Sequence, residues 1–215
     1  MSIIVEKNYT KTEGLFLFDQ EFRQNAPVLA GVDEAGRGPL AGPVVCAAVV
    51  MPAEGFIEGV NDSKKLSEKR REALYEKIVE CALAFSVVFV DPQEIDRINI
   101  LNATKRGMVQ SIGALNIKPD LVLIDAVKLP VDLPQRAIVQ GDAKSYSIAA
   151  ASILAKVSRD RYMRKMDQTY PQYGFAKHKG YGTKEHIEKI RQYGLCEEHR
   201  KTFALKFASP PTEEV

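Results

Sequence analysis

The chain has 215 residues, of which 45% are hydrophobic and 27% charged, and its formal net charge is only +2. That length suits one generous domain better than two, and the composition is that of a globular protein that folds on its own core. The three cysteines match no zinc or disulfide spacing, and no apolar run is long enough to span a membrane. A disulfide scaffold, a zinc module and a membrane-spanning protein are therefore excluded. Without a recognisable signal peptide, we expect a soluble, cytoplasmic protein. One domain with no obvious association surface suggests a monomer.

The predicted elements of the first half alternate between strands and helices. A polar lead-in over 1–27 precedes a short buried strand over 28–32, and a turn-rich stretch separates it from an apolar strand over 44–50. Ser67 is a suitable N-cap for a helix over 67–82, and a strand over 84–90 follows. Asn99 then begins a helix that reaches about residue 112.

In the second half, strands are predicted over 121–124 and 137–139, and a long alanine-rich helix over about 143–168. Thr183 caps a last helix, which ends at Gly194. The main domain then covers 28–205, and residues 206–215 form a tail that we expect to be disordered. Mixed strands and helices predict an α/β fold with helices covering a sheet.

Carboxylates follow three of the predicted strands. Asp33 and Glu34 come after the first, Asp125 after the fourth and Asp142 after the fifth. Strand ends of an α/β sheet are where ligands collect, and gathered carboxylates need a cation to offset their repulsion. Oxygen ligands favour Mg²⁺ or Mn²⁺ over zinc. Each acid alone is as readily a loop or helix cap, so only their convergence argues for a metal site.

Three further segments have the chemistry to bind a nucleic-acid backbone. Gly36-Arg37-Gly38 lets the main chain approach phosphate or sugar oxygens, with a guanidinium between the glycines. Lys64, just before a helix, can hold a phosphate. Tyr181 stands between two glycines with lysines nearby, which suits a sugar or base packing on its ring. Taken singly, these segments are also compatible with solvated turns and with a tyrosine at the edge of the core.

The ordered set of segments resembles ribonuclease HII, the type 2 ribonuclease H family. The matching stretches occur in the family's order from about residue 28 to 200, and the sister family, ribonuclease HIII, differs at the Gly-Arg-Gly segment. They are VDEAGRGPLAGPVV at 32–45, NDSKKLS at 61–67, NATKRGM at 102–108, LIDAVKLP at 123–130, GDAKSYSIAAASILAKVSRDRYM at 141–163 and KHKGYGTKEH at 177–186.

The resemblance implies the ribonuclease H fold: a central mixed five-stranded sheet flanked by helices, with a small C-terminal helical part. It also implies an endonuclease that cuts the RNA strand of RNA–DNA hybrids and ribonucleotides embedded in duplex DNA, with two ions of Mg²⁺ or Mn²⁺, leaving 5′-phosphate and 3′-hydroxyl ends. The implied site residues fall into two groups. Catalytic metal ligands would be Asp33, Glu34, Asp125 and Asp142. Substrate contacts would be Gly36, Arg37 and Gly38 at the 2′-hydroxyls, Lys64 at a phosphate, and Tyr181 at the deoxyribose downstream.

Three other interpretations stay open at this point. The chain could be a non-catalytic module that binds hybrids, or another nuclease or strand-transfer enzyme of the same fold. Enzymes of that second kind share clustered acids but lack the Gly-Arg-Gly and Lys-Gly-Tyr-Gly segments. A metabolic α/β enzyme is the third, but the sequence has no GxGxxG or P-loop to cradle phosphates.

Overall fold

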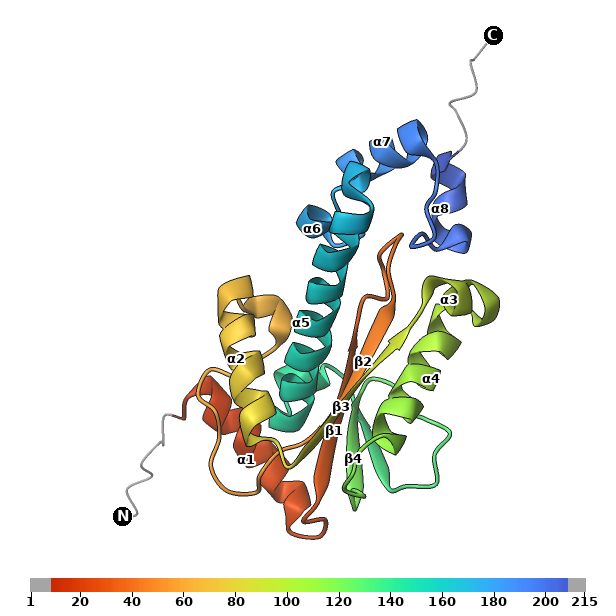
Figure 1. The fold of residues 1–215 in the computed structure, drawn as a ribbon. Helices are drawn as coiled ribbons and strands as arrows, with labels where there is room; N and C mark the ends of the chain where they lie inside the picture. Colours follow the sequence, from red (N-terminus) through yellow and green to blue (C-terminus); the bar gives the residue numbers. More distant parts are fainter. Residues whose placement is uncertain (1–8, 209–215) are drawn as a thin grey trace. The chain divides into compact units, whose positions relative to one another are not determined.

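The structure is a computed structural model that describes residues 9–208 (Figure 1). The chain divides into two compact units. The first comprises the chain up to Asp33 with Ala48–Phe85 and Leu115–Ile153, and the second comprises Glu34–Ala47, Ser86–Ala114 and the chain from Leu154. We describe each unit by itself.

Within residues 9–208, five strands form one sheet, in the order β3-β2-β1-β4-β5. Strand β1 pairs in parallel with β4, and β4 pairs in parallel with β5. This mixed sheet with its flanking helices confirms the predicted fold class. The bounds are β1 (Leu29–Ala35), β2 (Val44–Val50), β3 (Ala84–Val90), β4 (Leu121–Asp125) and β5 (Gln135–Ile138).

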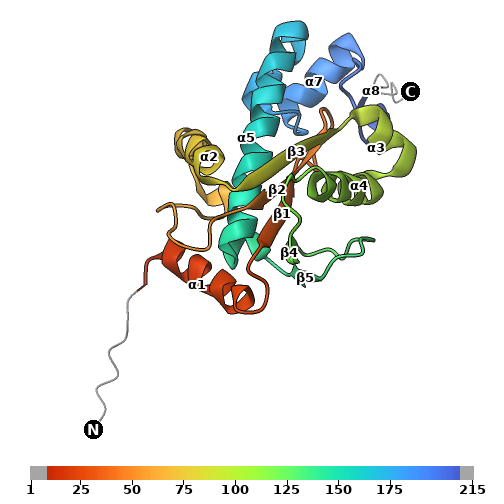
Figure 2. The ribbon, with the colours of Figure 1, turned by 60° about the horizontal axis from the view of Figure 1, so that its bottom comes forward.

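The first unit contains α1 (Lys11–Arg23), α2 (Glu68–Cys81) and the start of α5 (Tyr146–Thr169). Helix α1 lies within the lead-in over 1–27, for which no helix was predicted. Asp19 connects it to the start of α5. Its carboxylate accepts hydrogen bonds at 2.6 Å from the Ser145 hydroxyl and at 2.7 Å from the Ser147 N–H. Figure 2 shows α1 beside the beginning of α5. Helix α5 lies very close to β1, because a Cβ on Gly31 would stand 2.1 Å from the Ser147 carbonyl carbon.

The second unit contains the rest of α5 and the remaining helices. These are α3 (Pro92–Ile98), α4 (Ile100–Gly113), α6 (Phe175–His178), α7 (Lys184–Tyr193) and α8 (Lys201–Ala208). Helices α6 to α8 are the predicted C-terminal helical part. The prediction of a disordered tail from residue 206 is wrong for 206–208, which belong to α8, where Ala204 is buried against Leu40 and Ile190. Residues 209–215 lie outside the described part of the chain.

Local signals explain most of the helix ends. The side chains of Ser67 and Thr183 accept N–H groups of the first turns of α2 and α7, as predicted. The long helix begins at Tyr146 rather than near residue 143, because a 3₁₀ turn (Gly141–Ala143) comes first. Within residues 9–208, no helix combines the length and the apolarity needed to cross a membrane.

Candidate active site

Neighbouring strand ends bring three predicted carboxylates to one place in the first unit. Val32 of β1 is the parallel partner of Ile124 of β4, so the next residue on each strand is an aspartate, Asp33 and Asp125. Parallel neighbours stand about 4.8 Å apart. The Gly141 N–H donates to Asp125 Oδ1 at 2.7 Å, and this bond holds the 3₁₀ turn that carries Asp142 beside Asp125. Asp125 is the last residue of β4, Asp33 lies two residues before the end of β1, and Asp142 follows β5 in the 3₁₀ turn.

Lys64 extends into this cluster from a second 3₁₀ turn (Ser63–Lys65). Its Nζ lies 3.2 Å from Asp142 Oδ2, and its N–H donates at 2.9 Å to Asp62, the residue that caps the turn. Partial burial alone would lower the pKa of Lys64. The hydrogen bond to Asp142, with the charges of Asp142, Asp33 and Asp62, raises it overall. The ammonium thus stands within the field of several carboxylates.

Burial and like charge act on Asp125. Burial is the main cause that raises its pKa, and the neighbouring charges of Asp142 and Asp62 add to this, while the Gly141 N–H and Lys64 oppose it. Asp33 and Asp142 are also buried, at 4% and 5% exposed. Such a cluster of oxygen donors is suited to a divalent cation, because the cation would offset both the burial and the like charge that raise the pKa of Asp125.

The carboxylates do not already stand as a finished coordination shell. Among the described residues, no group of three or more His, Cys, Asp or Glu side chains is arranged to hold a metal ion. The hydrogen bonds explain this, because the Gly141 N–H takes an oxygen of Asp125 and the Lys64 ammonium takes one of Asp142. A bound cation would have to displace these two donors.

Glu34 and the Gly-Arg-Gly segment belong to the second unit. The Glu34 carboxylate lies 3.5 Å from the Arg37 guanidinium. Gly36 has φ +94°, and a Cβ there would stand 2.0 Å from Nε of the buried Arg159, so glycine is required both by conformation and by space. Arg37 and Gly38 are exposed, which leaves them free to meet a ligand.

Tyr181 lies beside this segment in the same unit. A Cβ on Gly38 would be 4.0 Å from Cε1 of the tyrosine ring, and 44% of Tyr181 is exposed. The backbone carbonyl of Tyr181 is 2.9 Å from His186 Nδ1, and its N–H donates to the His178 carbonyl at 3.0 Å. The structure therefore brings Gly38 and Tyr181 together, although they lie far apart in the sequence.

Sequence reasoning missed three residues that shape these regions. Asp62 enters the sequence analysis only as part of the stretch NDSKKLS at 61–67. Its Asp-Ser-Lys order is nevertheless a capping signal for the turn that presents Lys64. Arg159 and Arg200 are both 0% exposed and bind backbone carbonyls of the second unit. No sequence signal distinguishes them from surface arginines.

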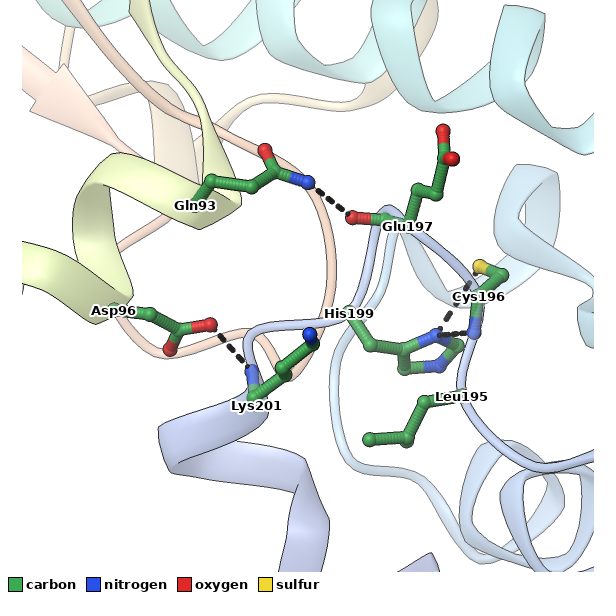
Figure 3. A pocket seen from close by; sticks show the side chains of 7 residues that line it. All are labelled: Gln93, Asp96, Leu195, Cys196, Glu197, His199 and Lys201. Carbon is green, nitrogen blue, oxygen red and sulfur yellow. Dashed lines mark hydrogen bonds between the residues drawn. The ribbon is translucent and has the colours of Figure 1, made fainter.

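A cavity of about 420 Å³ in the second unit contains none of the predicted site residues (Figure 3). It is lined by Gln93, Asp96, Leu195, Cys196, Glu197, His199 and Lys201. Its Cys196 and His199 lie 3.2 Å apart, Sγ to Nδ1, but they are not a nucleophile and its base. Burial raises the pKa of the Cys196 thiol to about 11, and His199 Nδ1 accepts the Cys196 N–H at 3.0 Å. Cys196 is therefore not an activated nucleophile.

Comparison with known proteins identifies the family to which the chain belongs. Residues 30–209 match the model of the ribonuclease HII family. A ribonuclease HII of Bacillus cytotoxicus is 59% identical over 85% of this chain and 70% of its own length, and one of Acetivibrio thermocellus is 52% identical over 94% and 80%. The crystal structure of the ribonuclease H2 of Pyrococcus horikoshii superposes with a TM-score of 0.71 at 33% identity, covering 84% of this chain and 96% of that one.

The sheet, its helices and these relatives define the class as a ribonuclease H, a metal-dependent endoribonuclease. Within that class, the chain belongs to the ribonuclease HII family. The resemblance that the motifs carried is therefore confirmed.

Proposed function

We propose that this enzyme cuts RNA paired with DNA, and also single ribonucleotides embedded in duplex DNA, by two-metal-ion catalysis. The observation that carries the proposal is the convergence of Asp33, Asp125 and Asp142 around the Lys64 ammonium. A cluster of acids at parallel strand ends has the donors for divalent cations and lacks the imidazole or thiolate ligands typical of zinc.

The proposed metal ligands are Asp33, Glu34, Asp125 and Asp142. Glu34 joins the set through the peptide bond to Asp33, which places the two Cα atoms about 3.8 Å apart. When bound, a pair of Mg²⁺ or Mn²⁺ ions would activate the attacking water and neutralise the departing 3′-oxygen, which gives 5′-phosphate and 3′-hydroxyl ends. Asp142 would exchange its bond to Lys64 for this role, so that the Lys64 ammonium becomes available to a substrate phosphate.

Selection of RNA must come from the ribose, because the 2′-hydroxyl separates RNA from DNA at one nucleotide. We assign this reading to Gly36, Arg37 and Gly38, whose backbone a ligand can approach closely. Tyr181, with its half-exposed ring beside Gly38, would pack on the deoxyribose that follows the cut. An additional hydroxyl would crowd that ring, so an RNA-to-DNA junction is the favoured site.

The test is a labelled DNA duplex with one ribonucleotide, incubated with Mg²⁺, with Mn²⁺ and with EDTA. We expect cleavage at the ribonucleotide with either metal and none with the chelator. Binding without cleavage under all conditions would favour the non-catalytic module. Equal cleavage of an all-DNA duplex would favour another nuclease of the same fold.

The oligomeric state needs a separate measurement. We propose a monomer, since one domain of this size has the core it needs without a partner. Light scattering coupled to gel filtration would give 23.9 kDa for a monomer.

A further inference from the structure

Two buried arginines of the second unit hold the backbone of the segments that we propose to read the substrate. Arg159 and Arg200 are the largest fully buried side chains among residues 9–208. Side chains of this type are seldom fully buried without partners, because removing a guanidinium from water costs several kcal/mol unless hydrogen bonds compensate. Their partners therefore indicate what the burial achieves.

The partners of Arg200 are the carbonyls of the Gly-Arg-Gly segment. Its Nη2 donates to the Gly36 carbonyl at 2.6 Å, Nη1 to the Arg37 carbonyl at 2.8 Å and Nε to the Gly42 carbonyl at 2.9 Å. One planar guanidinium thus fixes the directions of two peptide groups in the Gly36–Gly38 segment, which we propose reads the ribose. A lysine has a single ammonium and cannot span three carbonyls in this way.

The partners of Arg159 connect residues 41–43, just after that segment, with the loop that carries Tyr181. Its Nη1 donates to the Lys179 carbonyl at 2.9 Å, Nη2 to the Ala41 carbonyl at 3.0 Å and Nε to the Pro43 carbonyl at 2.9 Å. Its guanidinium carbon also lies 5.8 Å from the centre of the Tyr181 ring. Because a Cβ on Gly36 would stand 2.0 Å from its Nε, Arg159 also packs directly against the Gly-Arg-Gly segment.

Backbone bonds complete this frame. The Gly180 carbonyl accepts the Leu40 N–H at 2.8 Å, and the Leu40 carbonyl accepts the Arg200 N–H at 2.9 Å. Burial lowers the pKa of Arg159, and it lowers that of Arg200 to about 9, with the charge of Arg159 as a further cause for Arg200. Two like charges are thus kept within electrostatic reach of each other inside the protein.

From these contacts we propose that Arg159 and Arg200 are positioning residues, which set the Gly36–Gly38 backbone and the Tyr181 ring in the geometry that reads the ribose. The inference rests on the proposed function, because it assumes that these two segments contact the substrate. Neither arginine contacts the substrate itself. Displacing a substrate-positioning group by about 1 Å lowers the rate on the order of 100-fold. A small loss of restraint should therefore produce a measurable fall in the cleavage rate.

The experiment compares Arg159→Lys and Arg200→Lys with the parent enzyme on the single-ribonucleotide duplex, at a temperature where all are folded by circular dichroism. Arg23→Lys is the matched control. Arg23 is a buried arginine that donates to the Pro27 and Met51 carbonyls at 3.0 and 2.9 Å, on segments without a proposed site residue. We expect kcat to fall about tenfold or more for Arg159→Lys and Arg200→Lys, with less change in KM, and by less than about twofold for Arg23→Lys.

A double-mutant cycle distinguishes a role of Arg159 in positioning Tyr181 from a role in stabilising the whole fold. If Arg159 acts through Tyr181, Arg159→Lys should reduce the preference for a single ribonucleotide over a continuous RNA–DNA hybrid, and this effect should disappear in the Tyr181→Ala background. Equal losses in both backgrounds, or rates that match those of Arg23→Lys, would overturn the inference. A parent enzyme that does not cut the single-ribonucleotide duplex would overturn the proposed function first, and with it this inference.

If either lysine variant does not fold, Gly42→Ala provides a second test of the positioning role. A Cβ at this φ of +84° would stand 2.3 Å from Met163 Sδ and 3.3 Å from Arg159 Nη2, so it disturbs the frame while both arginines remain. We expect the same loss of kcat. Unchanged kcat and substrate preference in a folded Gly42→Ala enzyme would refute the positioning role.

Discussion

Acid should destabilise this enzyme through a network of buried histidines near Tyr181. His186 and His199 are 0% and 2% exposed, and their Nε2 atoms lie 3.1 Å apart. His186 Nδ1 faces the Tyr181 carbonyl at 2.9 Å, which can only accept, so this nitrogen carries a proton and Nε2 is the acceptor. His199 Nδ1 accepts the Cys196 N–H, so its Nε2 carries the proton and donates to His186. All these bonds are satisfied only when both rings are neutral.

The size of the effect follows from the two pKa values. Burial lowers the pKa of both His186 and His199 to about 4, from the ordinary value of 6.5. The unfolded chain therefore takes up protons first as the pH falls, and stability is lost between pH 6.5 and 4 while it is fully present above 6.5. Lowering the pH from 7 to 5 should cost about 2 kcal/mol for each histidine and about 4 kcal/mol for the pair.

Urea unfolding at pH 7, 6 and 5 measures this loss. The control is the double variant His186→Asn/His199→Asn, which keeps polar side chains and removes the two titrations. The pH-dependent loss of the parent should exceed that of the variant by about 4 kcal/mol. A difference below about 1 kcal/mol, or an NMR titration that gives His186 a pKa above 6, would refute the reasoning.

Three further predictions concern the site and the core. Asp125→Asn should abolish turnover while hybrid binding stays largely intact, and activity within tenfold of the parent would remove Asp125 from the metal site. Tyr181→Ala should lose the preference for a single ribonucleotide within DNA, and side-by-side cleavage with unchanged selectivity would contradict its role. Gly31→Ala should cost about 1–3 kcal/mol or more of unfolding free energy, since its Cβ would meet the Ser147 backbone at 2.1 Å. Gly14→Ala, with open space around it in α1, should be neutral or stabilising, and similar unfolding curves for both variants would show that the close packing of α5 on β1 carries no such cost.

The strands and most helices were predictable because their signals are local. Residues 44–50 form one β-branched apolar run, and β2 has those same bounds. Helix α3 was missed although Asp91 caps it and Pro92 occupies its first turn, a pairing typical of helix starts. Helix α1 gave a weaker signal, because it buries Asp19 and Arg23 as well as Leu15. Those polar side chains find their partners elsewhere in the chain, so no local pattern identifies them.

The acidic cluster was predictable for a related reason. An aspartate near the carboxyl end of a parallel strand lies where ligands collect, and parallel pairing of β1 with β4 brings Asp33 and Asp125 together. The sequence did not predict the bond between Lys64 and Asp142, since it depends on how two 3₁₀ turns meet. Nor did it predict the burial of Arg159 and Arg200, whose partners are carbonyls that every residue possesses.

The buried arginines restrain a backbone segment that its glycines would otherwise leave flexible. The Gly36–Gly38 backbone, which we propose approaches a ribose, uses glycine, and glycine has more conformational freedom to lose than any other residue. Gly36 has no side chain to pack, so restraint must come from a group that binds its peptide oxygen, and the Arg200 guanidinium does this at 2.6 Å. A neutral donor would offer a weaker bond. If restraint of the reader is the reason for burying these charges, kcat should depend on the shape of the guanidinium and not on its positive charge alone, which is the difference that arginine-to-lysine exchange isolates.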